Sequence, residues 1–159
     1  MRIPVFLFLF ALPACAPRAE VITRYDDWTE FNETTTPEGE IFRDQQGIMT
    51  VRPVMIERGG QWAYGVLTNI RRRVPNGPMV ETIHSGDVPL QYERHDRLWS
   101  HCIDGCQRAE VGVIHLTEAA FRAAARTGLP LRVQGRRGRY EGTVPAALFA
   151  RVLAMDQTG

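Results

Sequence analysis

The chain contains no lysine, so all nineteen of its basic residues are arginine, and eighteen acidic residues oppose them. This near balance excludes the strongly basic surface by which nucleic-acid-binding domains hold phosphates, and we expect no nucleic-acid partner. The abundance of Ala, Gly and Pro points to an arginine-biased genome as the source of the arginine excess. Internal repeats and low-complexity tracts are lacking too. With 44% hydrophobic residues, the 159-residue chain can form one globular domain with its own core.

Signatures of catalysis are equally scarce. The chain has neither the Gly-x-Ser-x-Gly turn of serine hydrolases nor the His-Glu-x-x-His helix of zinc peptidases. His84-Ser85-Gly86-Asp87 contains the residue types of a catalytic triad, but adjacent side chains diverge, whereas a triad is assembled across a fold. We therefore predict no catalytic residue and no cofactor.

Long hydrophobic runs are absent except at the start of the chain. Arg2 precedes the apolar stretch Val5-Phe6-Leu7-Phe8-Leu9-Phe10-Ala11-Leu12. A cationic start followed by a short apolar stretch is typical of a secretory signal. The stretch is too short to cross a bilayer, which needs about 20 apolar residues.

The end of this stretch, Leu12-Pro13-Ala14-Cys15, resembles the lipobox of bacterial lipoprotein signals. The resemblance implies cleavage before Cys15 and lipid on its sulfur, which makes residues 1–14 a signal peptide and 15–23 a lipidated tether. Ala16 is not the aspartate that is associated with inner-membrane retention in enteric lipoproteins, so we expect an outer-membrane lipoprotein facing the periplasm. The alternative is cleavage after Ala16, which would release a soluble periplasmic protein.

Residues 24–159 are expected to form a single α+β domain. The aromatic residues Tyr25, Trp28 and Phe31 fit either a short helix or an irregular strand. Residues 48–56 and 62–70 read as antiparallel strands joined by a glycine turn. Pro53 predicts an edge or bulged position for the first of these strands, because proline has no N–H to donate to a ladder.

The middle of the chain predicts a meander of short strands. After the Asn76-Gly77 turn signal, residues 79–83 are expected to pair back with residues 62–70. Residues 88–95 and 97–102 are expected to form two further strands, with a turn at His95-Asp96.

The last third predicts two short helices. Thr117 is a candidate N-cap for a helix over residues 118–127, with Gly128 as its C-terminal stop. A hairpin turning at residues 135–138 follows, and Pro145 opens the second helix. The predicted fold is therefore a mostly antiparallel sheet, or a small β-sandwich, with two short C-terminal helices.

Cys102 and Cys106 form the densest cluster of reactive side chains, together with His101. If Ile103-Asp104-Gly105 is a hairpin loop, the two cysteines face each other with Cα atoms about 5.5 Å apart, a distance that suits a disulfide. With Cys15 lipidated, exactly these two thiols remain, and the periplasm is oxidising. We predict a structural Cys102–Cys106 disulfide.

Metal binding is the alternative use of the same residues. Two thiolates with His101, and with His95 or His115, could hold copper or zinc. The Cys-x-x-x-Cys spacing resembles that of periplasmic copper-handling proteins. However, Gln107 stands where the assembly factors have proline, and no histidine follows Cys106 as it does in the oxidase subunit.

Two arginine clusters complete the list of candidate sites. Arg71 and Arg73 in one cluster, and Arg136 and Arg137 in the other, could contact anionic groups, although strand alternation limits the charges on each face. Together these patterns predict a non-enzymatic structural or interaction module of the cell envelope, attached to a membrane by its lipid, with an envelope protein as the expected partner. A periplasmic metal-binding protein is the alternative.

Overall fold

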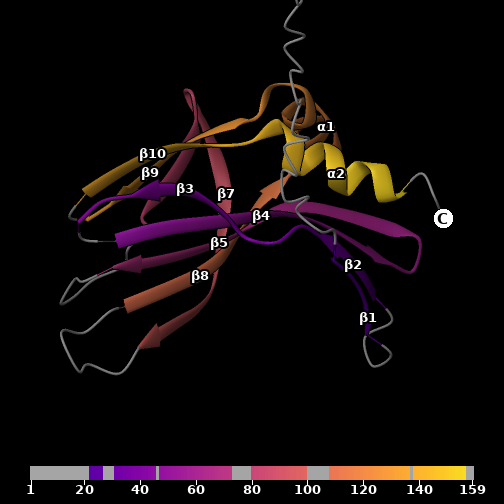
Figure 1. The fold of residues 1–159 in the computed structure, drawn as a ribbon, viewed down its shortest axis with the longest axis horizontal. Coiled ribbons are helices and arrows are strands. Elements are labelled where there is room, and N and C mark those ends of the chain that lie inside the picture. Colours follow the sequence, from indigo (N-terminus) through magenta and orange to yellow (C-terminus); the bar gives the residue numbers. More distant parts are fainter. Residues whose placement is uncertain are drawn as a thin grey trace, which may run out of the picture.

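The computed structural model of the chain describes residues 22–26, 31–45, 47–72, 80–99, 108–136 and 138–156. These residues form a mostly antiparallel sheet with two short helices, which confirms the predicted fold class (Figure 1). The strands are β1 (Ile22–Asp26), β2 (Phe31–Thr35), β3 (Gly39–Arg43), β4 (Gly47–Arg58), β5 (Gln61–Arg72), β6 (Thr82–Ser85), β7 (Val88–Trp99), β8 (Arg108–Leu116), β9 (Leu129–Gly135) and β10 (Gly138–Val144), and the helices are α1 (Glu118–Thr127) and α2 (Ala146–Asp156).

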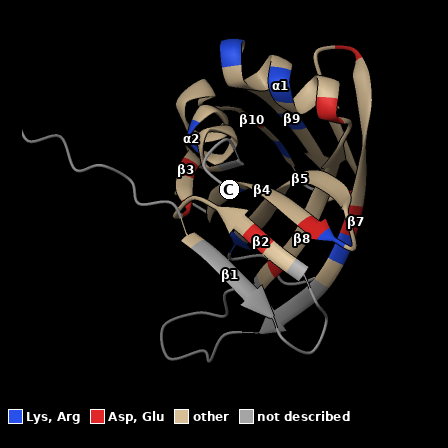
Figure 2. Ribbon diagram, turned by 90° about the vertical axis from the view of Figure 1, so that its right-hand side faces the viewer, with Lys and Arg blue, Asp and Glu red and all other residues tan. Residues whose placement is uncertain are grey.

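The sheet curls into a half-barrel instead of forming a sandwich. Its strand order is β1-β2-β4-β5-β8-β7-β6-β9-β10, and β3 pairs with β4 off this path. The curl brings β10 beside β3, where the rings of Phe42 and Tyr140 meet edge to face with centroids 4.9 Å apart. Figure 2 shows the strands following this curve, with the helices above one side. We call the line along which β3 and β10 meet the seam.

Pro53 lies in a strand that is paired on both sides, and its register with β5 continues through Pro53 without a shift, so the predicted edge or bulged position is wrong. The first half of β4 pairs with β3, its second half pairs with β2, and β5 runs along its other side. The Thr35 hydroxyl donates to the Pro53 carbonyl at 2.7 Å, so this residue's backbone polar groups face β2 and β3. β4 changes partner from β3 to β2 between Val51 and Val54, and the N–H that Pro53 lacks would point toward this change of partner. The hydrogen bonds between β4 and β5 are therefore unaffected.

The meander prediction also fails at β6. This four-residue strand pairs with β7 and β9, whereas the second neighbour of β5 is β8, through pairs such as Val66 with Ile114. A turn signal specifies that the chain reverses, but it does not specify which strand becomes the partner. The nine-residue β8 extends along β5 from Tyr64 to Arg72, which a strand as short as β6 cannot do.

The two short strands predicted around His95 are one strand. β7 runs without interruption to Trp99, and its register with β8 shifts between Arg94 and Asp96. His95 is thus the extra residue of a β-bulge and not part of a turn. A bulge bends a strand and increases its twist, which suits a sheet that curls.

Several local predictions are confirmed. The Thr117 hydroxyl accepts from the Ala120 N–H at 3.2 Å, and α1 ends at Gly128, whose φ of 78° favours glycine. The β4–β5 hairpin turns at Gly59 and Gly60 as predicted, and the predicted Gly135 and Gly138 form the last pair of the β9–β10 hairpin. Of the two structures that fit the N-terminal aromatic residues, helix or strand, the strand is found for Tyr25 in β1 and for Phe31 in β2. The first strand begins at Ile22, two residues before the predicted start of the domain.

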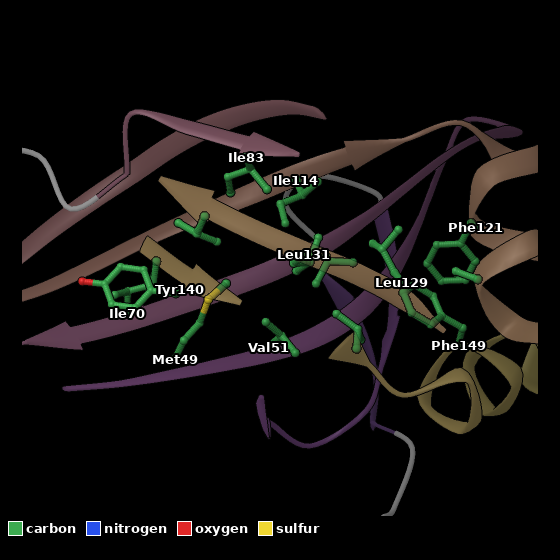
Figure 3. Packing of buried hydrophobic residues seen from close by; sticks show 14 of the residues in the cluster. Met49, Val51, Ile70, Ile83, Ile114, Phe121, Leu129, Leu131, Tyr140 and Phe149 are labelled. Atoms are coloured by element: carbon green, nitrogen blue, oxygen red, sulfur yellow. The ribbon is translucent and has the colours of Figure 1, made fainter. Parts of the chain in front are cut away.

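The hydrophobic core fills the concave side of the sheet (Figure 3). Phe121 of α1 and Phe149 of α2 are fully buried and meet edge to face at 5.0 Å, closing one end of the curl. At the other end, Met49, Ile70 and Tyr140 lie close together. The interior is therefore packed with side chains, as expected for a small barrel.

Candidate functional site

Polar side chains enter the core at the end away from the helices. On β8, Glu110 and Ile114 share the inward face, and Glu110 is paired across the ladder with Ile70. The Glu110 side chain has no exposed surface, and its Oε1 accepts from Nε of Arg94 at 3.1 Å. The Arg94 side chain is 32% exposed, so this ion pair joins a fully buried carboxylate to a guanidinium at the surface.

Tyr92 packs beside this ion pair. Its hydroxyl donates to Oε1 of Glu110 at 3.5 Å, and its ring covers Gly112, where a Cβ would lie 2.5 Å from the Tyr92 Cζ. Burial is the main reason that the pKa of Tyr92 is raised to about 12, and the Glu110 charge adds to the effect. A hydrogen bond with Thr68 and the Arg94 charge act in the opposite direction. The phenol is therefore protonated at neutral pH.

Arg72 forms a second polar cluster at the same end. Its guanidinium lies over the Tyr140 ring, 4.4 Å from the centroid, and its Nη2 donates to Asp44 at 3.1 Å. A Cβ built on Gly138 would lie 3.0 Å from Nη1 of Arg72, so this position leaves little room for a side chain. Arg72 thus ties the end of β5 to the start of β10.

A crevice of about 350 Å³ opens where β7 separates from β6. Its walls combine apolar and polar side chains, with Arg94 and Tyr92 among them. The full lining is Val80, Glu81, Thr82, Ile83, His84, Pro89, Leu90, Tyr92 and Arg94. Ligand sites are typically clefts of about 300–1,000 Å³, so this crevice has the size of a small-molecule site, while polar groups make up about half of its lining.

No known protein family, curated protein or solved structure matches this chain. The functional assignment consequently depends on the sequence and the structure alone. Among the described residues, neither helix is long and apolar enough to cross a membrane.

Most of the sequence-predicted site residues fall outside the described ranges. Cys15 belongs to the N-terminal segment, and His101, Cys102 and Cys106 belong to the connection between β7 and β8. The last described pair of that hairpin is Trp99 with Arg108. The lipidation, the disulfide and the metal site therefore stay predictions.

His115 is described and lies far from that connection. It is seven positions beyond Arg108 along β8, roughly 23 Å at about 3.3 Å per residue. Its Nε2 lies 3.0 Å from Oε2 of Glu93 on the outer face of the sheet. Within the described ranges, no three His, Cys, Asp or Glu side chains are grouped so as to hold a metal ion.

The arginine clusters are only partly described. Arg71 and Arg136 are exposed, whereas Arg73 and Arg137 lie outside the described residues. Arg72, which separates Arg71 from Arg73, points inward. Arg71 and Arg72 therefore point to opposite faces of the sheet, as strand geometry predicts. Of these two arginines, Arg71 is the exposed one.

Sequence reasoning missed Arg94, Tyr92 and Glu110 as a group. One signal was available, because Glu110 shares its strand face with Ile114, and a carboxylate on an apolar strand face needs a partner. The identity of that partner depends on the β7–β8 register, which includes a bulge. The sequence pattern does not specify that register.

Proposed function

We propose that the protein is a small cell-envelope lipoprotein, anchored through lipid on Cys15, whose folded domain is a non-enzymatic structural or interaction module. The observation that carries the proposal is Leu12-Pro13-Ala14-Cys15 directly after the apolar stretch that begins the chain. Two or three acyl chains hold a protein firmly at a membrane, since each buried methylene contributes about 0.8 kcal/mol. The proposed location is the periplasmic face of the outer membrane.

Ion pairs among the described residues are consistent with a structural or interaction module. Arg94 and Arg72 are paired with Glu110 and Asp44, and the surface cations Arg43, Arg122 and Arg139 each pair with a carboxylate on the same element. The Arg72 and Arg94 pairs join different elements and so help to hold the fold of the domain together.

Intact mass and membrane fractionation test the anchor. For protein purified from its native membrane without reductant, we expect a chain that starts at Cys15 and carries added acyl mass. Cys15→Ser should move the protein from the membrane to the soluble fraction. Cys102→Ser is the matched control, because it removes a different thiol and should leave the protein on the membrane. An unacylated wild-type chain in the soluble fraction would refute the anchor and favour the soluble periplasmic alternative.

The second candidate function is metal binding by Cys102, Cys106 and His101. The feature that favours it is the antiparallel β7–β8 pair, which confines these residues to one short connection between Trp99 and Arg108. Alkylation of the unreduced protein separates the two uses of the cysteines. Two labelled thiols, or a mass that includes copper or zinc, would favour the metal site, whereas unlabelled cysteines would favour the disulfide.

A further inference from the structure

The crevice between β6 and β7 exists because the two strands separate early. Their last pair is Ile83 with Leu90, after which β7 continues along β8 alone. On the other side, Thr82 pairs with Gln134 of β9. The wall of the half-barrel is therefore split between β6 and β7. Arg94 lines this split and connects it to the buried Glu110 carboxylate through their ion pair.

Arg94 is held in this split from two sides. Its Nε donates to Glu110 at 3.1 Å, and its Nη2 donates to the Val80 carbonyl at 2.9 Å. A guanidinium has five N–H donors in a rigid plane, so these two contacts fix its orientation and leave further donors for a ligand. The accessible apolar surface of the crevice comes from Pro89, which is exposed, and Leu90, which is half-buried.

The charge balance decides which ligand fits. Glu110 already neutralises Arg94, and the exposed Glu81 adds a negative charge to the crevice lining. An ionised acid would therefore gain no net attraction and would lose its hydration. A neutral carbonyl group can still accept a hydrogen bond from the fixed guanidinium, while an aliphatic chain covers the apolar wall.

We propose that this crevice binds a small neutral molecule with a carbonyl acceptor on an aliphatic body, and that Arg94 donates to the carbonyl oxygen. The site stands on its own geometry and does not depend on the lipid anchor. Tyr92, protonated at neutral pH, adds no charge to the crevice.

Three probes of matched length test the choice of ligand: hexanamide, hexanoate and hexylammonium. Titrations followed by amide chemical shifts in ¹H–¹⁵N spectra should show hexanamide binding in the millimolar range, as expected for so few atoms. The shifts should centre on Val80, Thr82 and His84. Hexanoate should bind at least about tenfold more weakly, because it is ionised at neutral pH. Equal binding of all three probes, or shifts spread over the surface, would overturn the proposal.

Two variants test the site. Arg94→Lys retains the positive charge for Glu110 but loses the planar fork, and it should weaken hexanamide binding about tenfold or more. Arg122→Lys is the matched control, because Arg122 is an exposed arginine of α1 paired with Glu118, and its binding should equal that of the wild type. Thr82→Phe fills the exposed rim without touching the Arg94–Glu110 pair and should also abolish binding. Unchanged binding in a folded Thr82→Phe variant would contradict the site even if Arg94→Lys failed to fold.

Discussion

At the scale of single residues, Arg94 and Glu110 contribute unequally to stability although they form one ion pair. The Glu110 side chain has no exposed surface, whereas 32% of the Arg94 side chain is exposed. Removal of the arginine leaves a buried carboxylate without this guanidinium. Removal of the carboxylate leaves a guanidinium that water can reach. The burial of each partner thus determines the cost of losing the other.

We accordingly expect Arg94→Met to lower the free energy of unfolding by about 3–5 kcal/mol. Glu110→Gln keeps the shape of the side chain and should cost less, about 1–2 kcal/mol. Urea unfolding of both variants and of the double variant would measure these values and their coupling. Equal losses in the two single variants would contradict the proposed asymmetry.

The raised pKa of Tyr92 makes stability depend on pH in the alkaline range. The pKa is about 12 in the folded protein and about 10 in an unfolded chain, so the unfolded state releases its proton first as the pH rises. The contribution of the protonated phenol is complete below pH 10 and is lost between pH 10 and 12.

Comparison of the wild type with Tyr92→Phe isolates this effect. At pH 8 the wild type should be the more stable protein, because the variant lacks the hydroxyl contact with Glu110. The difference should shrink as the pH rises from 10 towards 12. Urea unfolding at a series of pH values measures it. A constant difference across this range would show that Tyr92 does not titrate with a raised pKa.

At the scale of helices and strands, the elements with local signals could be predicted and their partners could not. Helix α1 is specified by residues within one turn of each end, Thr117 and Gly128, and both act as expected. The pairing of β5 with β8 depends on groups more than 40 positions apart, such as Thr68 and Gly112. Nothing near Thr68 in the sequence specifies that contact. The polar cluster on β7 and β8 was missed for a different reason, because the bulge at His95 shifts the β7–β8 register and the sequence pattern does not specify that register.

The seam gives a test at this scale. On β10, a Cβ built on Gly142 would lie 2.4 Å from the backbone carbonyl oxygen of Ile41. Gly142→Ala should therefore force the two strands apart and cost about 1–3 kcal/mol. Gly39→Ala is the matched control on β3, since its Cβ would lie 3.2 Å from the flexible Leu148 side chain and at an ordinary contact distance of 3.8 Å from the Val51 carbonyl oxygen. We expect a change below about 1 kcal/mol. Thermal unfolding of both variants checks the prediction. Equal effects would show that the seam tolerates a side chain.

At the scale of the whole molecule, the two ends of the half-barrel have different chemistry. The helix end is closed by Phe121 and Phe149, whereas the opposite end contains Arg72 and Glu110. The crevice lies in the wall between these ends, where β6 and β7 separate. A ligand in the crevice would thus contact the polar network without displacing the aromatic core.

The seam also has a consequence for the order in which the molecule assembles. It joins residues at positions 41 and 142, among the most distant contacts along the chain. A contact between such distant positions costs more chain entropy than a local one. We therefore expect it to form after the local hairpins and helices are in place. The β4–β5 hairpin, closed by a two-glycine turn, is the natural early element. The half-barrel is therefore complete only once β10 has docked against β3, and its concave apolar surface stays open to solvent until then.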